Sequence, residues 1–159
     1  MAIRKIKTDL DPVLRKVSRP VDEINDRIKI LLEDMTQTMY KAEGVGLAAP
    51  QIGVLRRVIV VDIGDGNVYK MINPKIIESD GKELGLEGCL SVPNRSGNVI
   101  RPKTIKVEYM DEEGNQNSLD ANDFLARAIC HEIDHLDGIL YIDIAEEIFE
   151  LVEDTEEQI

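Results

Sequence analysis

The sequence predicts an α+β fold, in which helices and strands occupy separate stretches of the chain. Two stretches, about 24–42 and about 122–138, carry apolar residues at helical spacing. The section between them holds three runs rich in β-branched residues, separated by turn-forming sequences. Helices that flank a block of strands, without a regular alternation of the two, are typical of the α+β class.

The first expected helix covers about 24–42. Its apolar residues recur at helical spacing: Ile24, Ile28, Leu31, Leu32, Met35 and Met39. Gly44 follows, and glycine is common just past the end of a helix. We therefore expect an amphipathic helix that places one face against the core.

The expected strands come next along the chain. They are RRVIVVDI (56–63), VYKMI (68–72) and KTIKVEYM (103–110). GDGN separates the first two runs and DEEGN follows the third, and both sequences are typical of tight turns. The middle of the chain is therefore expected to form a sheet.

The second expected helix is NDFLARAICHEIDHLDG (122–138), with Asn122 or Asp120 as its N-terminal cap and Gly138 as its stop. Beyond it, IAEEIFELV has acids that would face outward between apolar residues at amphipathic helical spacing: Ile144, Ile148, Leu151 and Val152. No repeat, low-complexity linker or domain boundary interrupts the sequence. We therefore expect residues 1–159 to form one domain.

Length and charge limit the possible functions. With 159 residues the chain can bury about two-thirds of its unfolded surface, so Cys89 and Cys130 need not form a disulfide. The first twenty residues have no apolar run long enough for a signal peptide or a membrane span, so we expect a cytoplasmic location and no membrane partner. The net charge is −12 and no Lys or Arg follows Arg127, so direct nucleic-acid binding is not expected.

The stretch HEIDHLDG (131–138) contains both histidines of the chain. On a helix, His131 and His135 lie on one face and can point at the same metal ion. Glu132 is rotated by about 100° from His131, so it can reach a metal-bound water as a general base without being a ligand. The alternative, a polar stripe on a solvated helix, is disfavoured by the neighbouring apolar residues Ile129, Ile133 and Leu136.

Two histidines rarely suffice to hold a metal, so a third ligand is expected elsewhere. Cys130 directly precedes His131 on the helix and points away from the histidine face, and Asp134 fails for the same reason. Cys89 lies in LEGCLSVP, a short glycine-containing stretch expected between sheet segments, and is the better candidate unless it is a buried structural thiol. One thiolate and two imidazoles leave an open position, as in catalytic sites, and favour zinc.

A third stretch, GVGLAAPQIG (44–53), loosely matches a dinucleotide-binding fingerprint. That motif needs a preceding strand, whereas here a helix precedes it and Pro50 disfavours a following helix, so we reject a dinucleotide cofactor. The sparse side chains around Gly46 would instead let another chain approach the backbone and pair with it. Gln51 would offer an amide donor there, unless it is a solvated residue in a surface turn.

GVGLAAPQIG, EGCLSVP and HEIDHLDG, in this order and at these separations, resemble the three motifs of peptide deformylase. That family removes the formyl group from the initiator methionine of nascent bacterial or organellar proteins. Order and length agree over nearly the whole chain. The resemblance implies an α+β fold with the HExxH helix packed among antiparallel sheets, and N-formylmethionyl nascent peptides as the substrate.

The resemblance also implies roles for individual residues. The metal would be held by Cys89, His131 and His135, with Glu132 moving protons. The residue matching Gln51 and the backbone N–H matching Leu90 hold the oxyanion in the family, and the segment matching Val45, Gly46 and Leu47 pairs with the peptide. The walls around the methionine side chain would include Val45, Glu87, Leu125, Ile129 and Cys130. The implied metal is Fe²⁺, with Zn²⁺, Ni²⁺ or Co²⁺ as possible replacements.

The sequence departs from the family pattern at two places. Ser96 stands where family members often carry a basic side chain, and Arg95 precedes it, so either could contact the peptide backbone. From Asp143 onward the chain has eight acids and no base, so a tail that docks on ribosomal RNA is not expected.

Two other classes stay open at this point. A HExxH endopeptidase would take a third ligand downstream, where Glu146, Glu147 and Glu150 are the candidates. A non-catalytic interaction module would use a closed structural zinc site, for which the sequence offers no obvious fourth Cys or His ligand.

Overall fold

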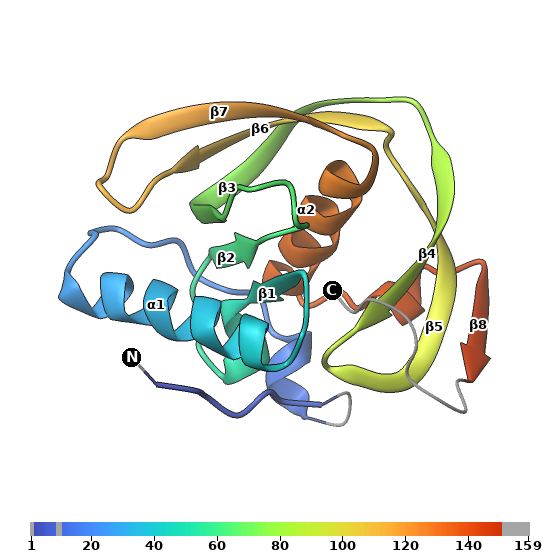
Figure 1. Ribbon diagram of the computed structural model, residues 1–159, viewed down its shortest axis with the longest axis horizontal. Helices are drawn as coiled ribbons and strands as arrows, with labels where there is room; N and C mark the ends of the chain where they lie inside the picture. Colours follow the sequence, from blue (N-terminus) through green and yellow to red (C-terminus); the bar gives the residue numbers. More distant parts are fainter. Residues whose placement is uncertain (1, 9–10, 151–159) are drawn as a thin grey trace.

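The computed structural model describes residues 2–8 and 11–150, which form two antiparallel sheets and two α-helices (Figure 1). The first sheet has the order β1 (Gly46–Ala48), β2 (Val58–Val61), β3 (Tyr69–Asp80), β6 (Thr104–Met110), β7 (Gln116–Asn122). The second has the order β4 (Glu83–Cys89), β5 (Val92–Arg101), β8 (Glu147–Glu150). The helices are α1 (Asp26–Lys41) and α2 (Asp123–Leu136), with short 3-10 helices η1 (Pro12–Arg15), η2 (Ala49–Ile52) and η3 (Tyr141–Asp143). The α+β class is confirmed.

A bent two-stranded ribbon joins the two sheets. Asp80 of β3 pairs with Thr104 of β6, and only a few residues further on Glu83 of β4 pairs with Arg101 of β5. The same two chain segments therefore stay paired as they leave the first sheet and enter the second. Figure 1 shows this ribbon crossing above α2 and descending on the right as β4 and β5. The bend brings the far end of the β4–β5 hairpin back toward α2.

Strand β2 divides the core between the two helices. Its four residues are all fully buried, and they alternate between two apolar clusters. Val58 and Val60 pack in the cluster that contains α1, whereas Ile59 and Val61 pack in the cluster that contains α2. Because successive strand residues point to opposite faces, the first sheet holds a helix on each face.

Helix α1 closely follows the range expected from the sequence. The Asn25 side chain accepts a hydrogen bond from the Ile28 N–H at 3.2 Å and caps its start. At its end Glu43 adopts a positive φ of 59°, and the Gly44 N–H donates to the Met39 carbonyl at 3.0 Å. Gly44 therefore lies one residue beyond the left-handed position that glycine usually occupies.

Helix α2 ends at a glycine that the fold requires. Gly138 has a φ of 75°, its N–H donates to the His135 carbonyl at 3.2 Å, and the Ile139 N–H donates to the Asp134 carbonyl at 3.0 Å. A Cβ on Gly138 would lie 2.5 Å from the Arg15 carbonyl oxygen. The glycine therefore lets the N-terminal segment pass directly against the helix end.

The start of α2 and the run after it differ from expectation. Asn122 occupies the N-cap position without a side-chain hydrogen bond, and Asp120 lies within β7. The helical spacing read after Gly138 is wrong for Glu147–Glu150, which forms β8 and pairs with β5. Pairing with a neighbouring strand supplies backbone partners that override the local pattern. Leu151 and Val152, the other part of that run, lie outside the described residues.

Strands β1, β4, β5 and β7 were not expected as strands. Their sequences contain Gly, Pro, Asn and acidic residues, which are depleted in strands. The three expected strands correspond to β2, β3 and β6. No helix in residues 2–8 and 11–150 is long and apolar enough to cross a membrane.

Candidate metal centre

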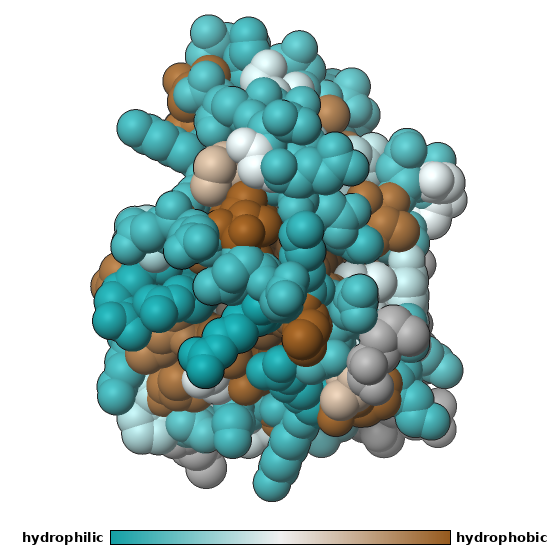
Figure 2. All heavy atoms as spheres, turned by 90° about the vertical axis from the view of Figure 1, so that its left-hand side faces the viewer, coloured by the Kyte–Doolittle hydropathy of each residue, from teal (hydrophilic) through white to brown (hydrophobic). Residues whose placement is uncertain are grey.

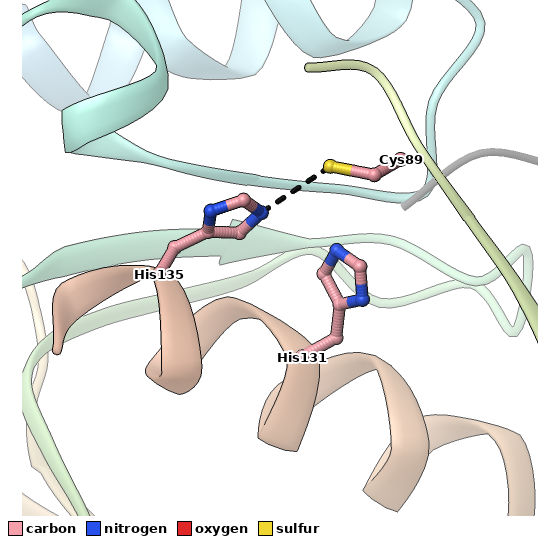
Figure 3. A group of neighbouring side chains, drawn as sticks. All are labelled: Cys89, His131 and His135. Atoms are coloured by element: carbon pink, nitrogen blue, oxygen red, sulfur yellow. Dashed lines mark hydrogen bonds between the residues drawn. The ribbon is translucent and has the colours of Figure 1, made fainter. Parts of the chain in front are cut away.

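The β4–β5 hairpin delivers Cys89 to helix α2 (Figure 3). Cys89 is the last residue of β4, pairs with Val92, and is followed by the two-residue turn Leu90–Ser91. Cys89 therefore lies in a sheet and not between sheet segments as expected. Its Sγ is 3.4 Å from His135 Nε2, and the ligand atoms of Cys89, His131 and His135 all lie within 4.8 Å of one another.

Among the described residues, His131 presents a free nitrogen to this point, whereas His135 Nε2 already contacts the Cys89 sulfur at 3.4 Å. His131 Nδ1 is 2.8 Å from Glu87 Oε1, which leaves His131 Nε2 buried without a hydrogen-bond partner among the described residues. Figure 3 shows both rings facing the Cys89 sulfur from α2. A sulfur and two imidazole nitrogens, all buried and converging, are the donor set of a three-ligand transition-metal site. The orphaned His131 nitrogen fits a divalent cation that it would coordinate.

The pKa shifts of Cys89 and His135 also fit a site for a cation. Burial raises the pKa of the Cys89 thiol, and the nearby Glu132 raises it further. Burial lowers the pKa of His135 well below its usual value, and His131 adds to this. Neutral imidazole is the form that binds metals, and a cation would supply the positive charge that the buried thiolate lacks.

Other candidate ligands are not part of the group. Cys130 is buried but does not join the cluster found among the described residues. The downstream carboxylates Glu146, Glu147 and Glu150 are all exposed and none joins it either. The third ligand of a HExxH endopeptidase is therefore not supplied here by any described residue.

Glu132 lies beside the cluster, and its carboxyl group makes no hydrogen bond to the described residues. The side chain is fully buried, and neither carboxylate oxygen has a partner among the described residues. Burial raises its pKa well above the usual value, with the charge of Glu87 as the next cause. A Cβ on Gly46 would lie 2.4 Å from Glu132 Oε2, so the glycine of β1 makes room for the carboxyl group. Such a carboxyl group can take up and release a proton.

Gln51 is held rigidly with its amide N–H groups toward the cluster. It is fully buried in η2, so the alternative of a solvated glutamine in a surface turn is wrong. Its Oε1 accepts a hydrogen bond from the Ala48 N–H at 2.9 Å, which fixes the amide orientation. Its Nε2 donates to Ser91 Oγ at 3.0 Å and lies 3.7 Å from Cys89 Sγ. Leu90 is half-buried in the turn next to Cys89.

The residues expected around the methionine side chain fall into two groups. Val45, Ile129 and Cys130 belong to one apolar cluster, against which Leu125 packs. Glu87 is the charged member of the expected set. It is 1% exposed, and its carboxylate is bound by Arg101 and Arg127.

Glu87 is the centre of a buried ionic network. Arg101 donates to it through Nε at 2.9 Å and Nη2 at 3.0 Å, and Arg127 donates through Nη1 at 2.7 Å. Burial alone would raise the pKa of Glu87, but hydrogen bonds from Arg101 and His131 outweigh it and hold that pKa well below its usual range. Asp134 accepts from Arg101 Nη1 at 2.6 Å and extends the network. Glu87 therefore stays charged and orients His131.

Sequence reasoning missed three members of this shell. Arg127 precedes His131 by one helical turn, so a lone arginine on the histidine face was the available signal. Tyr141 stacks on His131 with ring centroids 6.0 Å apart and an interplanar angle of 26°. Arg101 and Tyr141 reach the site only through the fold, and no local pattern marks them.

A buried Cys–His–His cluster with a free carboxyl group at its edge, on an α+β fold, defines a metal-dependent hydrolase. The family model for polypeptide deformylase matches residues 3–149, and the chain belongs to this family. The peptide deformylase of Thermoanaerobacter pseudethanolicus is 54% identical over 159 residues, covering 100% of this chain and 98% of that protein. The peptide deformylase of Agathobacter rectalis is 52% identical, covering 99% of this chain and 100% of that protein. The crystal structure of peptide deformylase from Thermotoga maritima superposes with a TM-score of 0.89 at 40% identity, covering 92% of this chain and 100% of that one.

Proposed function

We propose that this chain removes the N-formyl group from the initiator methionine of nascent polypeptides and releases formate. The observation that carries the proposal is the convergence of Cys89, His131 and His135 beside the unpartnered carboxyl group of Glu132, in a chain that belongs to the polypeptide deformylase family. We further propose that the whole chain forms one catalytic domain, supported by a family match that spans most of its length.

Cys89, His131 and His135 would hold the metal. We propose Fe²⁺ as the metal in the cell, with Zn²⁺, Ni²⁺ or Co²⁺ able to replace it. One sulfur and two nitrogen donors suit all four of these borderline or soft cations, so the choice of iron rests on the family resemblance. When bound, a divalent cation supplies Lewis-acid activation of water and of the formyl carbonyl.

Glu132 carries the protons. It takes one proton from the attacking water and later delivers a proton to the amine as the formyl C–N bond breaks, while the water oxygen ends in formate. Its lack of a hydrogen-bond partner among the described residues supports this role, because the carboxyl group is free to meet the water and then the amine.

Gln51 and the Leu90 N–H stabilise the charge that develops on the formyl oxygen. The support is that Gln51 is already oriented by Ala48, with its amide nitrogen toward Cys89. Donors that need no rearrangement are the effective ones, and losing one typically costs about 3 kcal/mol of barrier stabilisation.

The peptide would lie along β1, which is an edge strand of the first sheet among the described residues. Val45, Gly46 and Leu47 would pair with it as one strand pairs with another. The methionine side chain would fit among Val45, Leu125, Ile129 and Cys130, which already share an apolar cluster. We assign Glu87 to holding His131 instead. Arg95 is partly exposed whereas Ser96 is buried, so Arg95 is the better candidate for a contact with the peptide backbone.

We propose a cytoplasmic location and no direct nucleic-acid partner. Two buried, unlinked cysteine thiols and a nascent-peptide substrate support a reducing compartment. The net charge of −12 supports the absence of a direct nucleic-acid partner, because it repels a phosphate backbone.

The function is tested by measuring formate release from formyl-Met, acetyl-Met and unblocked peptides. We expect release from the first alone at an appreciable rate, because a methyl group on the carbonyl overfills a site shaped for hydrogen. Cys89→Ala should lose the metal, whereas the matched control Cys130→Ala, also a buried free thiol, should keep it. Cleavage of internal peptide bonds without formate release would refute the proposal.

A further inference from the structure

A hollow lies away from the metal centre, at the start of α1. It is a cavity of about 810 Å³ between the segments around Arg19, Arg27 and Arg56, with Val21, Ile28 and Leu31 among its apolar lining. None of the metal-centre residues lines it. Figure 2, which views the end of the molecule where α1 begins, shows apolar side chains gathered among strongly hydrophilic ones on this face.

Two of the arginines are held side by side by the backbone. Arg19 and Arg56 are direct partners in an isolated parallel β-bridge, fixed by the Arg19 N–H donating to the Leu55 carbonyl at 3.2 Å. The Arg57 N–H donates back to the Arg19 carbonyl at 3.0 Å. Like charges directly opposite each other across strands are destabilising. The fold therefore pays for this placement unless an anion compensates the two charges.

The third arginine is also unfavourably placed. Arg27 lies in the first turn of α1, whose N-terminus carries a partial positive charge. A cation in that turn is repelled by the helix end, although Asp26 in the same turn supplies the acid that the helix end favours. Three arginines of this cavity thus lie close to other positive charge, from one another or from the helix end.

Neighbouring acids form no close ion pair with these arginines. Within residues 2–8 and 11–150, the side chains of Arg19, Arg27 and Arg56 have no ion pair or hydrogen bond, although Asp22 and Glu23 also line the cavity. Arg4 lines it too, but Asp34 already pairs with that guanidinium at 2.7 Å. Three arginines without an ion pair to a described residue therefore face two acids, so positive charge is in excess in this cavity.

We propose that this cavity binds a phosphate monoester that carries an apolar body. Guanidinium groups match phosphate oxygens in pairs, and the N-terminus of a helix adds further attraction for the same group. Three arginines can serve three oxygens of a doubly charged phosphate, while the apolar lining accepts the organic part. A soluble phosphate ester and a lipid headgroup share this chemistry.

The test uses phenyl phosphate as the probe, measured by calorimetry on the metal-loaded protein, with inorganic phosphate and chloride at matched ionic strength. We expect phenyl phosphate to bind more tightly than inorganic phosphate and to raise the melting temperature, and chloride to do neither. Arg56→Gln and Arg19→Gln should each weaken the binding by at least about tenfold, because each loses charge-assisted hydrogen bonds. Lys29→Gln, which removes an exposed charge of α1 outside the cavity, should bind as the unmodified chain does.

The melting temperatures of the unliganded variants show whether Arg19 and Arg56 bind a ligand or stabilise the fold. Both arginine variants should melt at the same temperature as the unmodified chain or higher, because each relieves a like-charge pair, and deformylation should be unchanged. Sedimentation with phosphatidic acid vesicles then identifies a lipid source if the protein binds them. Equal phenyl phosphate affinity in all variants, lower melting temperatures of the unliganded arginine variants, or tighter salt-dependent binding of single-stranded RNA than of phenyl phosphate would overturn the proposal.

Discussion

The two sides of the metal centre place the same kind of side chain in opposite surroundings. On the hairpin side, Glu87 is 1% exposed and its carboxylate receives hydrogen bonds from Arg101 and Arg127 and contacts His131. On the side facing β1, Glu132 is 0% exposed and its oxygens have no partner among the described residues. Burial raises both pKa values, but hydrogen bonds from Arg101 and His131 outweigh it at Glu87, whereas the pKa of Glu132 stays raised by burial and by the charge of Glu87.

This difference assigns the two carboxyl groups to different tasks. A carboxylate with a lowered pKa keeps its charge and can orient a histidine ring. A carboxyl group with a raised pKa and no fixed partner can exchange a proton with substrate. Pairs of acids whose environments separate their pKa values are a common sign of divided roles in catalysis.

The largest expected effect is that of Glu132→Gln on turnover. The substitution keeps the shape and the metal ligands but removes the proton carrier, so formate release should fall by at least about a hundredfold. Metal content, measured on the same sample, should be unchanged. An active Glu132→Gln protein would show that Glu132 is not the proton carrier, and its contrast with Glu87 would then have no catalytic meaning.

Glu87→Gln should act on stability and metal affinity. It leaves Arg101 and Arg127 buried beside a neutral amide, so we expect the free energy of unfolding to fall by about 3 kcal/mol, measured by urea denaturation. Metal affinity should fall by about 10-fold to 100-fold, because His131 loses its orienting charge. Glu132→Gln is the matched control, and equal stability losses in the two variants would mean that the ionic partners of Glu87 contribute nothing.

Gly46→Ala tests whether β1 fixes the position of Glu132. The added Cβ would lie 2.4 Å from Glu132 Oε2, so the carboxyl group must move. Overpacking of this kind costs about 1–3 kcal/mol, and we expect formate release to fall with metal content retained. Turnover equal to that of the unmodified chain would show that Glu132 is free to relocate and that the fit against β1 has no functional role.

The smallest expected effect belongs to Tyr40, a largely exposed side chain with one charged partner. Tyr40 is 44% exposed and donates to Asp62 Oδ2 at 2.6 Å; this hydrogen bond and, after it, partial burial raise the tyrosine pKa from 10.0 to about 12. Because the folded pKa is raised, this contribution to stability is complete below pH 10 and disappears as pH rises through about 12.

Tyr40→Phe should therefore lower the free energy of unfolding at neutral pH by no more than about 1 kcal/mol, since water screens the pair. An absorbance titration of tyrosinate should lose the ionisation near pH 12 in this variant. A loss as large as that of Glu87→Gln would indicate that burial is not what makes the Glu87 network strong.

Local patterns in the sequence were sufficient for part of this molecule. The helix expected over about 24–42 is α1 over Asp26–Lys41, because the spacing of apolar residues reports which face of a single helix is buried. The spacing of His131 and His135 likewise placed two imidazoles on one helical face. Each of these conclusions depends on residues within a few positions of one another, which is the range over which the geometry of a helix acts.

Contacts across long stretches of chain were decided only by the tertiary structure. Cys89 meets His135 across 46 positions and Glu87 meets His131 across 44, because the bent ribbon returns the β4–β5 hairpin to α2. The role of Glu87 depended on Arg101 and Arg127, whose convergence no local periodicity records. Strand β8 shows the same limit, since pairing with β5 overrode its helical spacing. The sequence by itself predicted the two helices and placed two imidazoles on one helical face, whereas sheet register decided which charges are paired and which carboxyl group is free, because a pKa depends on every charge that folding brings near it.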